Sequence, residues 1–226
     1  MATLYNPNIV TDGLVLCLDA ANKRSYIGSG TAWDDLAGGN NGTLTNGPTF
    51  DAGNGGSVVF DGTNDYADLG NVLNITGGIS ISAWVKVDTF PGGSNRSLIL
   101  SKGYDGTDEP YHLGFALNVL RWYTYDGSIH GVVWTHNLLA STWYLITGTF
   151  DGSAWRLYVD GAEVAVTSDS TALTTTTESV LIGSSSLEGT PSRFFDGSIS
   201  NSLVYNRALN ADEIRQNYEA TKGRYS

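Results

Sequence analysis

Alternation of apolar and polar residues at every second position is the feature that most restricts the fold of this chain. In the segment 79–88 (ISISAWVKVD), the odd-numbered positions are apolar and the even-numbered positions are mostly polar. This period of two is typical of a half-buried β-strand. Segments 142–150 and 154–160 repeat the pattern, and Asp160-Gly161 ahead of segment 162–166 predicts a tight hairpin turn.

About a dozen strand-like segments follow one another, with turn signals roughly every ten residues. They lie near 13–18, 42–45, 56–61, 65–69, 79–88, 97–102, 111–117, 119–125, 130–135, 142–150, 154–166 and 179–205. This spacing predicts an all-β protein in which two antiparallel sheets form a jelly-roll sandwich. No long linker divides the chain, so we expect residues 1–226 to form a single domain.

One helix is predicted near residues 211–220, at the C-terminal end of the chain. Asn210 is a suitable N-cap, and Glu213 three residues later completes a capping box. Ile214 and Tyr218 form a short apolar stripe one turn apart. We expect this helix to pack on an edge of the sandwich, where it would cover exposed strand backbone.

The charge balance excludes several classes of partner. The chain has 12 Lys and Arg against 23 Asp and Glu, which gives a formal net charge of −11. Nucleic-acid binding needs clustered basic residues, and none is present. An anionic membrane surface is disfavoured for the same reason, whereas an acidic surface suits divalent cations or simply maintains solubility.

Targeting signals and cysteines point to a protein made in a cytoplasm. The N-terminal residues 1–13 have neither a basic region nor an apolar stretch, so no signal peptide is predicted. No apolar run approaches the ~18 residues of a membrane span, and we expect no membrane insertion. The single cysteine, Cys17, lies in the apolar run 14–18 and is predicted to be a buried hydrophobe.

Catalysis is not expected. Sandwich glycosidases need two carboxylates about 5–5.5 Å apart on one strand face in their retaining form. None of the glutamates has that spacing on a predicted strand; they are Glu109, Glu163, Glu178, Glu188, Glu213 and Glu219. The three histidines have no zinc spacing, and no nucleophile elbow, P-loop or dinucleotide fingerprint is present.

Two Phe-Asp-Gly tripeptides, 60–62 and 195–197, suggest a calcium site. Calcium prefers carboxylate and carbonyl oxygens in glycine-rich loops. Asp61, Asn64 and Asp65 offer three oxygen donors on one turn, and Asp196 could add a fourth. The alternative is that these residues close hairpins as Asx-turns without any metal.

Aromatic residues provide a candidate ligand surface. Trp122, Tyr123 and Tyr125 fall on one predicted strand, and Trp134 falls on the next. Flat aromatic faces stack on sugar rings and are enriched in interfaces. The alternative is core packing, because Trp and Tyr also favour strands. Three further tryptophans in apolar runs are predicted to be core residues: Trp33, Trp143 and Trp155.

These segments resemble the concanavalin A-like, laminin-G-type jelly rolls. The matching pieces are SVVFDGTNDYADLG (57–70), ISISAWVKV (79–87), TWYLITGTFDGSAWRLYVDGAEV (142–164), LIGSS (181–185) and FFDGSISNSLVYNRALNADEI (194–214). The run YNRALNADEI followed by a helix is similar to the closing signature of that family. The resemblance implies a lectin-like fold, and with it a carbohydrate-binding module that recognises cell-surface glycans, with calcium as a conceivable cofactor.

The segment 13–50 is similar to the opening of stand-alone modules in tailed-phage proteins. That resemblance implies a non-enzymatic structural protein located on the virion, as a capsid decoration, neck, tail or fibre component. Other virion proteins and a host-surface glycan would then be its partners, and symmetric homo-oligomers are common among such appendages.

One departure from the family pattern concerns metal binding. Members have acidic residues after the final Phe-x-Gly, whereas this chain has the stretch 199–203, ISNSL. Asp61, Asp65 and Asp196 therefore remain as a reduced set of candidate calcium ligands.

Overall fold

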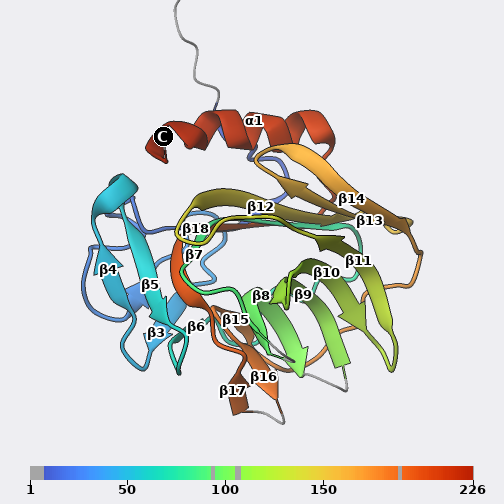
Figure 1. Cartoon of the computed structure of the whole chain (residues 1–226), viewed down its shortest axis with the longest axis horizontal. Coiled ribbons are helices and arrows are strands. Elements are labelled where there is room, and N and C mark those ends of the chain that lie inside the picture. Colours follow the sequence, from blue (N-terminus) through green and yellow to red (C-terminus); the bar gives the residue numbers. More distant parts are fainter. Residues whose placement is uncertain (1–7, 93–94, 105–107, 188–189, 226) are drawn as a thin grey trace, which may run out of the picture.

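The structure, a computed structural model, describes residues 8–92, 95–104, 108–187 and 190–225. They form two sheets packed face to face, with one α-helix near the C-terminal end (Figure 1). Every strand pairing is antiparallel except the short one between β8 and β16. The all-β sandwich predicted from the period-two alternation is confirmed.

The first sheet has the strand order β14-β13-β12-β7-β18-β5-β4, and β1 pairs with β18 as well. Its strands are β1 (Leu14–Asp19), β4 (Thr49–Asp51), β5 (Ser57–Asp61), β7 (Ile79–Val87), β12 (Trp143–Phe150), β13 (Ala154–Val159), β14 (Ala162–Ser168) and β18 (Asp196–Tyr205). A short 3-10 turn, η1 (Gly53–Gly55), precedes β5.

The second sheet has the strand order β11-β10-β9-β8-β15-β6-β3-β2, with the β16–β17 hairpin joined to β8. Its strands are β2 (Ala32–Trp33), β3 (Gly42–Thr45), β6 (Tyr66–Asp68), β8 (Arg96–Tyr104), β9 (Asp108–Ala116), β10 (Val119–Tyr125), β11 (Ile129–Thr135), β15 (Val180–Ile182), β16 (Ser185–Leu187) and β17 (Thr190–Ser192). Strands distant in the sequence are thus neighbours in both sheets.

The segment 179–205, which the sequence suggested as one strand region, contains four strands, β15 to β18. Gly183 ends β15 with φ +78°, a left-handed conformation that L residues rarely adopt. A Cβ at this position would lie 2.8 Å from the ring of Phe60, so both the turn and the close approach require glycine. Strands β2 and β4 were not predicted, because each is too short for alternation to show.

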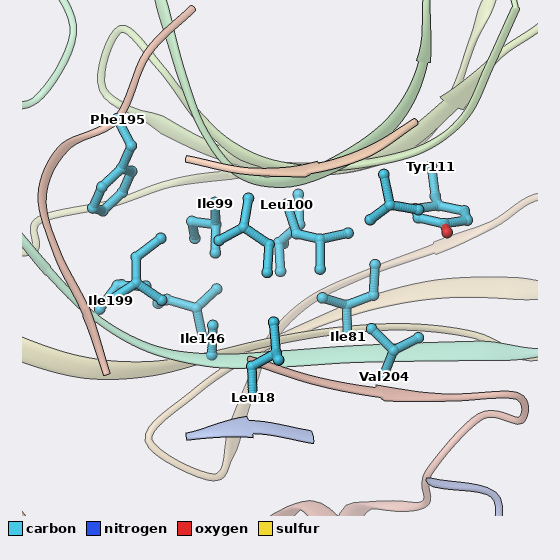
Figure 2. Packing of buried hydrophobic residues seen from close by; sticks show 14 of the residues in the cluster. Leu18, Ile81, Ile99, Leu100, Tyr111, Ile146, Phe195, Ile199 and Val204 are labelled. Carbon is cyan, nitrogen blue, oxygen red and sulfur yellow. The ribbon is translucent and has the colours of Figure 1, made fainter. Parts of the chain in front are cut away.

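The main core lies between the two sheets. Figure 2 shows side chains of both sheets meeting there, including Leu18, Ile81 and Ile146 from the first and Leu100 and Tyr111 from the second. Alternation on β7 is confirmed, because its odd-numbered residues all belong to this core. Burial of this apolar surface is the main contribution to the stability of the fold.

A second apolar cluster lies on the outer face of the first sheet, beneath α1 (Ala211–Thr221), and η2 (Lys222–Arg224) follows the helix. Its buried members are Val10, Cys17, Tyr158, Leu203, Tyr205, Leu209 and Ile214. Cys17 is therefore a buried hydrophobe, as predicted. The capping box is also confirmed, since the Asn210 side chain accepts hydrogen bonds from the backbone N–H groups of Asp212 and Glu213.

The predicted position of the helix at a sheet edge was wrong. Trp84 projects outward from β7 in the middle of the first sheet, and its ring stacks on Tyr225 with centroids 4.0 Å apart. The indole N–H of Trp84 donates to Thr221 Oγ1 at 2.7 Å. The helix therefore crosses the outer face of this sheet (Figure 1), because that face presents a large aromatic residue that needs cover. No helix among the described residues is long and apolar enough to cross a membrane.

Candidate functional site

The predicted aromatic ligand surface does not form. Trp122 has 0% of its surface exposed and packs in the core against Trp155, with centroids 5.3 Å apart. Tyr123 is 2% exposed. Neither ring can stack on a sugar from solvent. The prediction that Trp122 and Tyr123 contact a ligand is therefore wrong, because both residues are buried.

The other two aromatic candidates are half-buried, and they lie on opposite faces of the second sheet. Trp134 pairs with Leu120 on β10 and packs against the main core. Tyr125 alternates with the inward-facing Trp122 and Thr124 and therefore lies on the outer face. They form no shared platform, and their role as ligand contacts stays a prediction.

The two Phe-Asp-Gly tripeptides come together at one end of the sandwich. Asp61 at the end of β5 lies directly opposite Asp196 at the start of β18. Both phenyl rings point inward and meet edge to face, with the centroids of Phe60 and Phe195 6.5 Å apart. The repeated motif is thus a matched pair of strand ends that brings its aspartates to the same rim.

The hydrogen bonds at this rim are those of an Asx-turn. The Asp61 carboxylate accepts from the backbone N–H groups of Thr63 at 2.8 Å and Asn64 at 3.3 Å. These bonds, with that to Thr63 the largest contribution, lower the pKa of Asp61. Asp65 accepts from the Asp61 N–H at 3.2 Å, while burial first and the charge of Asp61 second raise the pKa of Asp65.

Calcium binding gains no support from the carboxylates at this rim. Within the part of the chain that the structure describes, no three His, Cys, Asp or Glu side chains gather in a way that could hold a metal ion. Asn64 is exposed, and its backbone carbonyl accepts from the Asn46 side chain at 2.9 Å. The site predicted from Asp61, Asn64, Asp65 and Asp196 therefore stays a prediction, with the Asx-turn as the arrangement observed.

A cleft of about 520 Å³ opens beside this rim, and we call it the end cleft. Its lining residues are Gly62, Thr89, Phe90, Pro91, Gly92, Asn95, Arg96, Ser97, Ser192, Arg193, Phe194 and Asp196. The volume lies within the range of small-molecule sites, roughly 300–1,000 Å³. The lining combines phenyl rings with hydroxyl, amide, carboxylate and guanidinium groups, so it can contact both the apolar and the hydroxyl faces of a ligand.

Arg96, at the start of β8, is hydrogen-bonded to a buried polar network. Its Nη1 donates to the Tyr123 hydroxyl at 3.1 Å, and that hydroxyl lies 3.0 Å from His112 Nδ1. His112 Nδ1 in turn lies 3.0 Å from Glu109 Oε2, and Glu109 is 2% exposed. Burial, followed by the charge of Arg96, lowers the pKa of His112 to about 3, so this imidazole is neutral at physiological pH. The Tyr123 hydroxyl thus links Arg96 to His112.

Arg193 has an unusual backbone beside Arg96. Its φ is +58°, in the left-handed region that non-glycine residues seldom adopt. Its carbonyl accepts from the Leu98 N–H at 3.2 Å, which fixes the residue against β8. Burial first, and the neighbouring charge of Arg96 second, lower the pKa of Arg193 to about 10.

Ser97 supplies a polar atom that the fold does not use. The residue is 3% exposed and lines the end cleft, and its Oγ has no hydrogen-bond partner among the described residues. Buried hydroxyls are normally paired, since an unpaired one costs about 1–3 kcal/mol.

The sequence did not single out these cleft residues. Arg96 and Arg193 belong to no local motif, and the strand order alone brings them together. The one signal available was position, because Arg193 lies two residues before the second Phe-Asp-Gly tripeptide, 195–197. The prediction followed the aspartate of that motif and missed the arginine three residues before it.

A second group of aromatic residues, on the outer face of the first sheet, anchors the C-terminal segment. Trp143, predicted to be core, is half-buried on the outer face of the first sheet. Its indole N–H donates to Asn54 Oδ1 at 3.1 Å, and its ring lies against Tyr225 with centroids 4.9 Å apart. Together with the Trp84–Tyr225 stack this arrangement anchors the C-terminal segment. Trp33 and Trp155 are in the main core, as predicted.

Comparison with solved structures shows the same fold in several proteins. Domain 4 of AbnA, a GH43 extracellular arabinanase from Geobacillus stearothermophilus solved with arabinotriose, matches with a TM-score of 0.74 and 17% identity, over 92% of this chain and 100% of that one. The receptor-binding domain of a botulinum neurotoxin C/D mosaic serotype matches with a TM-score of 0.71 and 15% identity, over 93% of this chain and 52% of that one. Trypanosoma rangeli sialidase matches with a TM-score of 0.67 and 20% identity, over 99% of this chain but only 36% of that one.

These identities show the fold alone, and proteins with this fold include enzymes as well as binding domains. No curated protein matches this sequence. A family model described as the concanavalin A-like lectin/glucanases superfamily matches residues 61–215, which is well over half of the chain. With the two-sheet sandwich, the paired Phe-Asp-Gly strand ends and the terminal helix already established, the chain belongs to the concanavalin A-like lectin/glucanases superfamily.

Proposed function

We propose that this protein binds carbohydrate in the end cleft and performs no catalysis. The observation that supports this best is the end cleft itself, a cavity of about 520 Å³ whose lining combines phenyl rings with hydroxyl, amide, carboxylate and guanidinium groups. Asn95 and Asp196 line the same cleft, and amide and carboxylate groups are suited to sugar hydroxyls. The arabinotriose bound to domain 4 of AbnA is consistent with a carbohydrate ligand for this fold.

The proposal is tested by screening the protein on a glycan array and measuring each hit by titration calorimetry. Asp196→Asn removes the cleft carboxylate, and Asp212→Asn is the matched control, since Asp212 is highly exposed on α1. We expect Asp196→Asn to weaken binding while Asp212→Asn leaves it unchanged. Equal affinity in all variants would falsify the assignment to this cleft, and hydrolysis of any bound glycan would refute the non-catalytic role.

Calcium dependence is measured in the same titrations. If Asp61, Asn64, Asp65 and Asp196 form a calcium site, EDTA should reduce glycan affinity and added calcium should restore it. The Asx-turn arrangement predicts no change, because the turn is already closed by backbone hydrogen bonds.

We further propose that the biological setting is a phage virion, where the protein would be a decoration, neck, tail or fibre component. This second proposal is supported by the resemblance of segment 13–50 to stand-alone modules of tailed-phage proteins. Mass spectrometry of purified virions tests it through the copy number. A copy number in the hundreds indicates capsid decoration, a few copies indicate a tail, neck or fibre part, and absence from particles refutes the proposal.

A further inference from the structure

A small cavity lies on the outer face of the first sheet, beside the C-terminal segment, and we call it the aromatic pocket. Its volume is about 240 Å³, and it shares no lining residue with the end cleft. Pockets for drug-sized ligands measure roughly 300–1,000 Å³, so this one suits a smaller group. Its lining includes two charged residues, Asp160 and Lys222, and four aromatic residues: Trp84, Trp143, Tyr218 and Tyr225.

The aromatic rings line this pocket in two orientations. Trp84 stacks on Tyr218 with centroids 5.9 Å apart and an angle of 26° between the rings. The ring of Trp143 is inclined by 49° to that of Tyr225, with centroids 4.9 Å apart. Trp143, Tyr218 and Tyr225 are half-buried, so each retains surface that a ligand can contact. The faces of such rings are electron-rich and attract cations.

Asp160 is the acidic group of the aromatic pocket, and it lies in the turn between β13 and β14. Its Oδ1 accepts from the Leu145 N–H at 2.8 Å. Burial raises the pKa of Asp160, and among the described residues only this hydrogen bond opposes that rise. No neighbouring lysine or arginine of the described chain therefore compensates its charge, which favours a ligand that brings a positive charge.

Lys222 also lines the aromatic pocket, but its charge is balanced by Glu219, whose Oε2 lies 2.6 Å from the Lys222 Nζ. The same ammonium lies 5.4 Å from the centre of the Tyr218 ring. A second lysine, Lys86, has its ammonium 5.7 Å from the centre of the Trp143 ring. Rings of this pocket thus attract cations already present in the chain, and the formal net charge of −11 favours cationic ligands further.

We infer that the aromatic pocket binds an organic ammonium cation, with the ammonium group against the aromatic rings and close to the carboxylate of Asp160. Quaternary and methylated ammonium groups are the chemical class that fits, since they are weakly hydrated and are recognised by aromatic rings gathered around them. The inference does not depend on the proposed glycan site, because the two cavities have no residue in common.

The first test compares choline with its neutral isostere 3,3-dimethyl-1-butanol, in which carbon replaces the charged nitrogen. Binding to the whole protein is followed by saturation-transfer NMR and tryptophan fluorescence, at constant ionic strength so that the general attraction to an acidic protein is screened equally. We expect choline to bind at least about tenfold more tightly than the alcohol. Equal affinity for the two compounds, or no binding of choline, would overturn the inference and would leave the glycan proposal untouched.

A charge variant then assigns binding to the pocket. Asp160→Asn removes the charge and keeps the turn, because asparagine tolerates the φ of +50° at this position and its side-chain oxygen can still accept from the Leu145 N–H. Asp212→Asn is the matched control, since the Asp212 side chain is 83% exposed on α1. We expect Asp160→Asn to weaken choline binding by about tenfold and Asp212→Asn to leave it unchanged. The inference fails if the two variants bind choline equally.

Tyr218 tests the contribution of the rings. Tyr218→Phe keeps the ring and Tyr218→Leu removes it, while circular dichroism checks that both variants are folded. We expect Tyr218→Leu to weaken choline binding about threefold to tenfold and Tyr218→Phe to bind like the unmodified protein, because the contact depends on the ring. If the two folded variants bind choline alike, the rings are not the binding surface and the inference is refuted.

Discussion

A glycine in the core gives the sharpest test of the packing. The ring of Trp122, from β10 in the second sheet, packs against Gly148 of β12 in the first sheet. A Cβ at residue 148 would lie 2.8 Å from two ring atoms of Trp122, whereas carbon atoms rest at roughly 3.5–4.0 Å. We therefore expect Gly148→Ala to destabilise the protein, because ring or strand must move by more than about half an ångström.

The magnitude follows from the lack of room for that movement. Trp122 is completely buried and already in contact with Trp155, so its ring cannot rotate away. Overpacking of such a core costs about 1–3 kcal/mol. The backbone of Gly148 has an ordinary strand conformation, in which alanine alone would stabilise by reducing the entropy of the unfolded chain. Any loss of stability therefore reports the contact with the ring.

The assay is urea unfolding followed by far-UV circular dichroism, which reports mainly on the backbone and does not use tryptophan fluorescence. Gly77→Ala is the control, since a Cβ added there would have no atom within 4 Å and the φ of Gly77 is not positive. In a double-mutant cycle, Trp122→Phe should remove part of the clash, so Gly148→Ala should cost less in that background. The reasoning is refuted if Gly148→Ala is as harmless as Gly77→Ala, or if its cost is the same with phenylalanine at 122.

Three further outcomes are expected. Asn210→Ala should cost about 1 kcal/mol in the same unfolding assay by removing the N-cap of α1, and Asn210→Asp should cost much less. The carboxylate of Asp169, followed by that of Asp126, raises the pKa of His130. A histidine whose pKa is raised in the folded state stabilises the protein below the unfolded pKa near 6.5. This stabilisation is lost as the pH rises through the folded pKa. His130→Gln should remove that pH dependence, and an unchanged stability-versus-pH curve would contradict the assignment. Burial raises the pKa of Cys17 to about 12, so a thiol reagent should label it only when the protein unfolds, and rapid labelling of the native protein would show that it is accessible.

Much of the fold was predictable because its signals are local. Alternation over 79–88 identified β7 and its two faces, and Asp160-Gly161 identified the turn between β13 and β14. The capping box at Asn210 located the start of the helix at Ala211, and the predicted end near residue 220 lies one residue before the observed end at Thr221. These features depend on neighbours in the chain, so they can be read from a single sequence.

The position of the helix was not predictable in the same way. Period two shows that Trp84 lies on the opposite face of β7 from the main core, but it does not show what covers that face. In the structure the C-terminal segment covers Trp84, through the hydrogen bond to Thr221 and the stack on Tyr225. Trp84 and Thr221 are 137 residues apart in the sequence, so this cover is a long-range property.

The candidate site also combines features that are local in the sequence with features that depend on long-range contacts. The sequence by itself determined the strands, their turns and the Phe-Asp-Gly repeat, because each is set by the conformational preferences of adjacent residues. Only the tertiary structure decided that Trp122 and Tyr123 are buried and that Arg96 and Arg193 share a cleft. Alternation assigns a side chain to one of two faces, whereas burial and proximity depend on which strands become neighbours, and the strand order of the two sheets sets that.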